Sequence, residues 1–214
     1  MKLASAKIRA PKILAILKKN YPDADCELHH RNPFELLISI ILSAQCTDKR
    51  VNMVTPELFK KYPTPKTLAK GKLSDIEKLI RSTGFFKNKA KSIKGCAEGI
   101  VRHHHGNVPQ TLEELTKLPG IGRKTANALL GHAFGIPGIV VDTHMIRLAT
   151  RLGLTKQKHP EKIERDLMPL LPQKDWTIFS SCIIFHGRRC CSARKPACSN
   201  CPVASLCPSA GIGV

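Results

Sequence analysis

Five of the nine cysteines in this 214-residue chain lie within its last twenty-five residues. Four of them follow the spacing C-x6-C-x2-C-x5-C, and four thiolates so close together can surround one metal centre. A structural zinc ion and an iron–sulfur cluster both remain open, but the single C-x2-C pair and the prolines after the last two cysteines favour the cluster. The predicted ligands are Cys191, Cys198, Cys201 and Cys207, whereas the adjacent Cys190 is expected to point elsewhere.

A second candidate site is the run Leu118–Ala126, in which Gly120 and Gly122 stand directly before a predicted helix. Glycine permits positive φ and close approach to the backbone, and the first amides of a helix attract anions. A short helix, a Gly-x-Gly turn and a second helix form a helix-hairpin-helix, which grips a DNA phosphate without reading sequence. The alternative is an ordinary turn between helices, but the Arg-Lys pair after the second glycine favours a phosphate.

Lys124 falls in the first turn of that second helix, where the helix dipole disfavours a cation. It is either another phosphate contact or an amine nucleophile. The second role is chemically possible because a helix N-terminus, partial burial and nearby positive charges all favour the neutral, reactive amine. Asp142 follows the apolar run Ile139–Val141, and we expect it to cap the helix that starts at Thr143. A carboxylate there can also stabilise a sugar cation or accept a proton.

Helices must position these groups, because the apolar residues recur with helical spacing and no run alternates as a strand would. We predict an all-α fold of two helical lobes. Asn32 is expected to cap a buried helix that begins at Pro33, and Ser74–Glu77 has the pattern of a capping box. A helix that starts near Asp48 should kink or restart at Pro56.

The composition points to a polyanionic partner. Lys and Arg number 35 against 16 Asp and Glu, which gives a net charge of +19, while 42% hydrophobic residues allow a buried core. Only 5% of residues are aromatic, which disfavours a single-strand binder built on stacking. The longest apolar run, Leu36–Leu42, is far shorter than the roughly 20 residues of a membrane helix, and no secretory signal is seen. We therefore expect no membrane partner and an intracellular location, in the cytoplasm or nucleoid.

From about residue 33 to residue 207 the chain resembles the endonuclease III family of DNA glycosylases, within the helix-hairpin-helix glycosylase superfamily. The cysteine spacing matches the family's cluster loop without a gap. The other matching runs are Pro33–Leu37, Leu42–Gln45 with Thr47-Asp48, Leu118–Asn127, Val141–His144 and His186–Arg188.

The resemblance implies a six-helix barrel domain with the helix-hairpin-helix at residues 26–136, and an iron–sulfur domain with a [4Fe–4S] cluster at residues 1–25 and 137–214. It implies a bifunctional DNA glycosylase and AP lyase of base excision repair. Lys124 would attack C1′ of a flipped nucleotide, and the resulting Schiff base would lead to β-elimination, with Asp142 assisting base loss and proton transfer. The expected substrate is double-stranded DNA with oxidised pyrimidines or abasic sites, and we expect a monomer.

The resemblance also assigns residues that touch DNA. Gln45 would fill the gap left by the flipped base, and Phe85, where the family often has Leu, would be the inserted wedge. His144 would meet the lesion backbone, and Arg194 and Lys195 would be presented by the loop between the first two cluster cysteines. Other basic residues near the motifs are expected to contact phosphate: Lys87, Lys89, Lys91, Lys94, Arg188 and Arg189.

Two rival functions are open. An adenine–DNA glycosylase shares the lobes and the cluster, but that family usually lacks a lysine at the position of Lys124 and carries a further C-terminal domain. A non-catalytic DNA-binding module could use the hairpin and a zinc loop, with Lys124 and Asp142 incidental. Covalent trapping on an abasic duplex separates the enzyme from the binding module.

Overall fold

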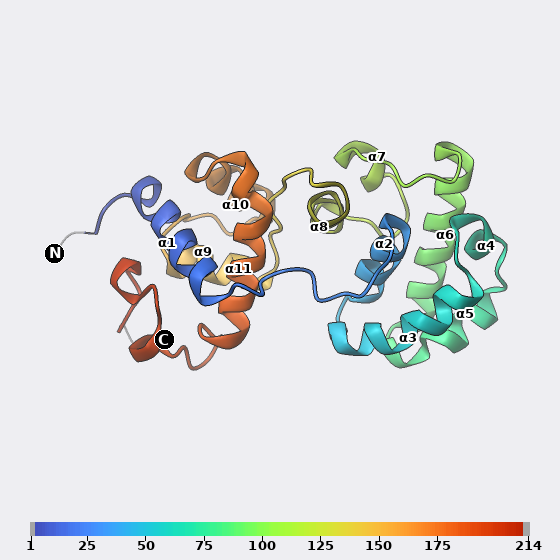
Figure 1. Cartoon of the computed structure of the whole chain (residues 1–214), viewed down its shortest axis with the longest axis horizontal. Helices are drawn as coiled ribbons and strands as arrows, with labels where there is room; N and C mark the ends of the chain where they lie inside the picture. Colours follow the sequence, from blue (N-terminus) through green and yellow to red (C-terminus); the bar gives the residue numbers. More distant parts are fainter. Residues whose placement is uncertain (1–2, 212–214) are drawn as a thin grey trace. The chain divides into compact units, whose positions relative to one another are not determined.

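The computed structural model describes residues 3–211, which form helices and loops without a β-strand (Figure 1). The all-α prediction is confirmed for this part of the chain. The chain folds into two compact units. Residues Cys26–Ile136 form one unit, and the residues up to Asp25 together with those from Pro137 onward form the other. Each unit has its own hydrophobic core. Within residues 3–211, no helix is long and apolar enough to cross a membrane.

Three helix pairings are prominent in the unit Cys26–Ile136. Helix α6 packs against α4 and α5, and α2 packs against α8 (Figure 1). As predicted, α2 is a core helix, in which Leu36, Leu37 and Ile38 are fully buried. The helices of this unit are α2 (Pro33–Leu42), α3 (Asp48–Lys61), α4 (Pro65–Lys70), α5 (Leu73–Ile80), α6 (Phe86–His104), α7 (Leu112–Thr116) and α8 (Arg123–Phe134).

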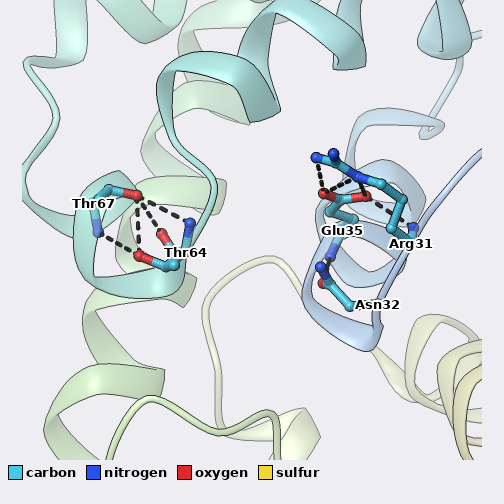
Figure 2. Close-up of polar contacts among 5 residues, drawn as sticks. All are labelled: Arg31, Asn32, Glu35, Thr64 and Thr67. Atoms are coloured by element: carbon cyan, nitrogen blue, oxygen red, sulfur yellow. Dashed lines mark hydrogen bonds and ion pairs between the residues drawn. The ribbon is translucent and has the colours of Figure 1, made fainter.

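Side-chain caps define where α2 and α4 begin (Figure 2). Asn32 Oδ1 accepts a 3.0 Å hydrogen bond from the Glu35 amide, which confirms the predicted cap. The buried Glu35 carboxylate pairs with Arg31 at 2.6 Å. At α4 the Thr64 hydroxyl accepts from the Thr67 amide at 3.2 Å, and the Thr67 hydroxyl accepts from the Thr64 amide at 3.0 Å. These bonds satisfy helix-end amides that have no partner inside the helix.

One local prediction is wrong. The capping box at Ser74–Glu77 is absent, because α5 begins earlier, at Leu73, and its N-cap residue makes no side-chain cap bond. At Pro56, where a kink or a restart was predicted, the restart is excluded, because α3 continues through this residue. Thr55 and Leu58 on either side of this proline are buried in the core, so packing holds the helix together despite the missing amide.

Helix α11 is central to the second unit, where it packs against α1 and α9 (Figure 1). The cysteine-rich segment follows α11 and contains two short 3-10 helices, Cys198–Asn200 and Ala204–Leu206. The α-helices of this unit are α1 (Ala6–Asn20), α9 (Thr143–Arg151), α10 (Pro160–Leu167) and α11 (Trp176–Arg189).

Arg9 links α1 to the rest of its unit. Its buried guanidinium donates hydrogen bonds to the carbonyls of Ala4, Leu152, Gly153 and Leu206, at 2.5 to 3.0 Å. These acceptors lie before α1, after α9 and in the cysteine-rich segment. A buried charge is tolerated only when it is hydrogen-bonded, so the four carbonyls and the guanidinium fix one another.

Candidate functional site

The predicted hairpin consists of α7, a tight turn and α8. Leu118 and Ile121 anchor the turn in the core, and the Ile121 amide donates to the Leu118 carbonyl at 3.2 Å. Between them, Gly120 has a φ of +80°, and a Cβ there would lie 2.8 Å from the Cβ of Ser92 in α6. Glycine is required at this position, because both the backbone conformation and the packing exclude a side chain.

Gly122 has a different role in the same turn. Its φ is −96°, so the positive φ that both glycines permit is used by Gly120 alone. Gly122 is exposed at the N-cap of α8, and a Cβ there would meet nothing within 4 Å. The start of α8 therefore presents bare backbone, which suits an anion that approaches a helix N-terminus.

Lys124 lies in the first turn of α8, and its side chain is exposed. The partial burial expected from the sequence is therefore wrong. The amine extends from the end of the helix at which the backbone amides concentrate positive potential. It is open to a ligand bound at the turn, as both a nucleophile and a phosphate contact require.

Asp142 is the N-cap of α9, as predicted. Its Oδ1 accepts a 2.7 Å hydrogen bond from the Met145 amide. The apolar run before it is buried, and the Val140 amide in that run donates to Ser180 Oγ at 3.0 Å. The half-buried carboxylate is thus held at the end of a fixed apolar segment. Asp142 belongs to the second unit, whereas Lys124 belongs to the unit Cys26–Ile136.

His144 lies in the first turn of α9 and is held by Arg147. The His144 Nδ1 atom is 3.0 Å from Arg147 Nη2, and since a guanidinium only donates, Nδ1 accepts and the ring proton is assigned to Nε2. The same Nη2 also lies 3.0 Å from the carbonyls of Gly187 and Cys191, so its two N–H groups are shared among three acceptors. A Cβ at Gly187 would lie 2.7 Å from His144 Nδ1, which explains the glycine in the His-Gly-Arg run.

Gln45 and Phe85 share an unusual backbone conformation. Their φ angles are 52° and 46°, and both side chains are exposed, Phe85 by 67%. The left-handed conformation costs a residue with a side chain about 1–2 kcal/mol. Such strain is often found at binding and catalytic positions, where the surrounding structure holds it in place. An exposed aromatic ring on a strained turn is the geometry expected of the predicted wedge.

The four predicted metal ligands border one cavity of about 30 Å³. Four sulfur donors on an apolar wall suit a soft centre, so the residues fit an iron–sulfur cluster, and by donor type alone they also fit zinc. The apolar wall of this cavity includes Leu148, Leu152 and Val203.

Cys190 and His186 lie at the same cavity. Their ligand atoms and the sulfur of Cys201 are all within 4.8 Å of one another. Burial raises the pKa of the Cys201 thiol to about 11, so a thiolate there needs a nearby cation to stabilise it. Burial lowers the pKa of His186 to about 4, and its Nδ1 lies 2.9 Å from the Tyr21 hydroxyl, so this imidazole is neutral.

Arg151, at the end of α9, supports the segment between the first two predicted ligands. Its guanidinium donates to the carbonyls of Ser192 and Ala193, each at 2.7 Å. Arg194 and Lys195 follow directly and are exposed. The two cations therefore lie on a loop whose backbone is hydrogen-bonded to Arg151. Arg151 was not among the residues predicted for the site.

Some basic residues expected to meet phosphate make internal contacts instead. Lys94 is hydrogen-bonded to the Ala69 carbonyl and forms a 3.0 Å ion pair with Glu98. Arg189 pairs with Asp23 at 2.6 Å. The positive charge of these two side chains is already engaged within the protein.

Lys89 is the clearest departure from the sequence prediction. Its side chain is only 5% exposed, and Nζ donates hydrogen bonds of 2.8 Å to the carbonyls of Leu42 and Thr83. It is therefore not a surface phosphate contact. The signal was present in the sequence, because helical spacing places Lys89 on the same face as Ile93 and Ala97, both fully buried.

Two family models match the chain. Residues 38–173 match the HhH-GPD superfamily base excision DNA repair protein, and residues 191–207 match the iron-sulfur binding domain of endonuclease III. The second match begins at Cys191 and ends at Cys207, so it contains the four predicted ligands and leaves out Cys190.

Curated relatives and solved structures extend over nearly the whole chain. Endonuclease III of Synechocystis sp. is 59% identical over 98% of this chain and 96% of the relative. Endonuclease III of Bacillus subtilis is 45% identical over 87% of this chain and 86% of the relative. A solved endonuclease III, trapped as a covalent intermediate with DNA, superposes with a TM-score of 0.91 at 44% identity, covering 95% of this chain and 96% of the other.

Proposed function

Because the chain belongs to the endonuclease III family within the HhH-GPD superfamily, we propose that Lys124 is the nucleophile of its reaction and Asp142 the carboxylate that assists it. The protein is a DNA N-glycosylase with AP lyase activity in base excision repair, and it carries a [4Fe–4S] cluster. The observation that supports the role of Lys124 most directly is its position, exposed in the first turn of α8 beside the bare Gly122 backbone.

The proposed reaction uses the neutral amine of Lys124. Its nitrogen lone pair bonds to C1′ of the sugar, and the bond from C1′ to the base breaks, so that the base leaves with the bonding electrons and takes up a proton. Opening of the sugar ring gives a Schiff base between C1′ and Nζ. Loss of a C2′ proton then expels the 3′ phosphate by β-elimination, and water releases the lysine.

Asp142 is suited to two steps of this sequence. Its carboxylate can stabilise positive charge on the sugar as the base departs, and it can accept a proton from the attacking amine. The hydrogen bond from the Met145 amide holds Oδ1 in place, so the carboxylate needs little reorganisation during the reaction.

The exposed groups of the unit Cys26–Ile136 fit a bent, unstacked duplex. The amides at the start of α8 bind a phosphate next to the lesion, with Gly120 shaping the turn and Gly122 leaving room. Gln45 fills the space of the flipped nucleotide and Phe85 enters the base stack. In the second unit, His144 contacts the lesion backbone, and Arg194 and Lys195 contact phosphates.

We assign the barrel domain with the helix-hairpin-helix to residues 26–136, and the iron–sulfur domain to residues 1–25 and 137–214. The ligands are Cys191, Cys198, Cys201 and Cys207. When bound, the cluster supplies a structural centre that fixes the loop bearing Arg194 and Lys195, and no step of the reaction passes through it.

The proposed substrates are oxidised pyrimidines and abasic sites in double-stranded DNA, and the active form is a monomer. Since the proposed substrate is double-stranded DNA, the proposed location is intracellular, in the cytoplasm or nucleoid.

Reduction with borohydride on a duplex that holds one abasic site tests the role of Lys124. The parent protein should become covalently joined to DNA, whereas Lys124→Gln should bind the duplex and give no adduct. Lys78→Gln, an exposed lysine in α5, is the matched control and should trap as the parent does. Undiminished trapping by Lys124→Gln would overturn the assignment. A cleavage panel with thymine glycol, an abasic site and A opposite 8-oxoguanine then distinguishes the substrate classes.

A further inference from the structure

Lys89 is a buried cation that the proposed reaction does not use. It lies in the first turn of α6, where a positive charge is disfavoured by the helix dipole, and burial lowers its pKa. A buried ammonium in this position is costly unless acceptors compensate it. Lys89 has two, the carbonyls of Leu42 and Thr83, each 2.8 Å from Nζ.

Both acceptors end segments that lead directly into exposed, strained residues. Leu42 is the last residue of α2, and Gln45 follows three positions later. Thr83 ends the 3-10 helix Arg81–Thr83, and Phe85 follows two positions later. The Lys89 ammonium therefore joins two segments that are 41 residues apart (83 − 42) and that carry the proposed insertion residues.

Each of the two segments is also ordered by its own hydrogen bonds. In the turn after Leu42, the Cys46 amide donates to the Ser43 carbonyl at 3.0 Å. The Thr83 hydroxyl is buried and donates to the Ile80 carbonyl at 2.8 Å. The carbonyls that Lys89 binds thus lie next to locally hydrogen-bonded turns, and Nζ contacts both.

We infer that Lys89 is a positioning residue for DNA insertion: its hydrogen bonds to the Leu42 and Thr83 carbonyls hold Gln45 and Phe85 at a fixed separation, so that the two side chains enter the duplex together. The inference rests on the insertion roles proposed above. It explains why a lysine occupies the apolar face of α6, since its three N–H donors can span two separate carbonyls.

Lys89→Met removes the hydrogen bonds and the charge while keeping most of the side-chain volume. We expect single-turnover excision of thymine glycol to fall about tenfold, because the loss of charged hydrogen bonds leaves the two turns free to relax. Lys89→Arg, which can still donate to two carbonyls, should restore most of the rate. Lys78→Met removes the same charge from an exposed site in α5 and should excise at the parental rate.

A double-mutant cycle separates positioning from general structural damage. In a Gln45→Ala, Phe85→Ala background, Lys89→Met should lower the rate by less than about twofold, because the residues through which it acts are already gone. A 2-aminopurine beside an abasic analogue gives a second readout, and its fluorescence at saturating protein should rise less with Lys89→Met than with the parent. If Lys89→Met does not fold, Lys89→Gln replaces it in the same double-mutant cycle.

The outcomes are distinguishable. An equal loss of rate in both backgrounds, or no loss in the parent background, would overturn the role of Lys89 and leave the proposed function intact. If Gln45→Ala, Phe85→Ala excises and unstacks DNA as the parent does, the insertion roles themselves fail, and the inference about Lys89 fails with them.

Discussion

The Asp142 carboxylate caps helix α9 by accepting a 2.7 Å hydrogen bond from the Met145 amide. Asn can accept the same bond but carries no charge, so two substitutions divide the structural role from the chemical one. Asp142→Ala should lower the free energy of unfolding by about 1 kcal/mol, and Asp142→Asn by much less. Both should lower base excision at least about a hundredfold, because the charge is lost in each. Thermal unfolding and single-turnover excision measure the two effects, and a fully active Asp142→Asn would limit this residue to capping.

The two glycines of the hairpin should respond in opposite ways to alanine. Gly120→Ala forces a side chain into a φ of +80° and against Ser92, so the free energy of unfolding should fall by about 2 kcal/mol or more. Gly122→Ala should cost under about 1 kcal/mol, since alanine is only a poorer cap, yet it should weaken DNA binding because its methyl group covers the bare amides. Denaturant unfolding and fluorescence anisotropy with duplex DNA check the pair. Unchanged DNA affinity in Gly122→Ala would argue against close backbone approach at this residue.

Adjacent cysteines provide a matched test of the cluster ligands. Cys191→Ser should lose iron, acid-labile sulfide and the visible absorbance of the cluster, because one of four thiolates is removed. Cys190→Ser should retain all three, although Cys190 lies at the same cavity. Iron and sulfide analysis of the two purified variants decides between them. Loss of the cluster in Cys190→Ser alone would point to the group that Cys190 forms with His186 and Cys201.

Arg194 and Lys195 should contribute mainly to the salt dependence of DNA binding. If each neutralises one phosphate, Arg194→Ala with Lys195→Ala should reduce the slope of log affinity against log salt by about 1.8, at about 0.9 for each phosphate. Lys66→Ala with Lys70→Ala removes the same charge from exposed positions in α4 and should leave the slope nearly unchanged. Binding titrations over a range of salt concentrations measure both slopes. Equal changes in the two double variants would show an effect of net charge rather than of contact.

Local signals were enough to predict the ends of the helices that carry the site. Gly122 predicted the start of α8, which begins at Arg123, and the Asp142 cap was predicted from its place before Thr143. At Ser74 the cap pattern was misleading, because α5 begins one residue earlier, at Leu73, which packs partly buried against the core, and no side chain caps it. Sequence patterns thus predict helix ends well where backbone conformation is decisive and less well where packing is.

Long-range contacts could not be predicted in the same way. The partner of Lys89 in α2 is 47 residues away, and Arg151 binds carbonyls about forty residues further along the chain. Charge alone suggested that Lys89 faces DNA, whereas the helical period placed it inside, and the period was the better guide. The exposure of Lys124 was also missed, because burial depends on neighbours that the hairpin sequence does not specify.

The four carbonyls bound by Arg9 have a consequence for synthesis on the ribosome. Helix α1 is synthesised before the other helices of its unit, but the acceptors at Leu152 and Leu206 follow Arg9 by 143 and 197 residues. The contiguous unit Cys26–Ile136 is complete long before then and can fold while the chain is still growing. Arg9 therefore reaches its full set of acceptors only after the whole unit Cys26–Ile136 has been synthesised and the cysteine-rich segment has followed it.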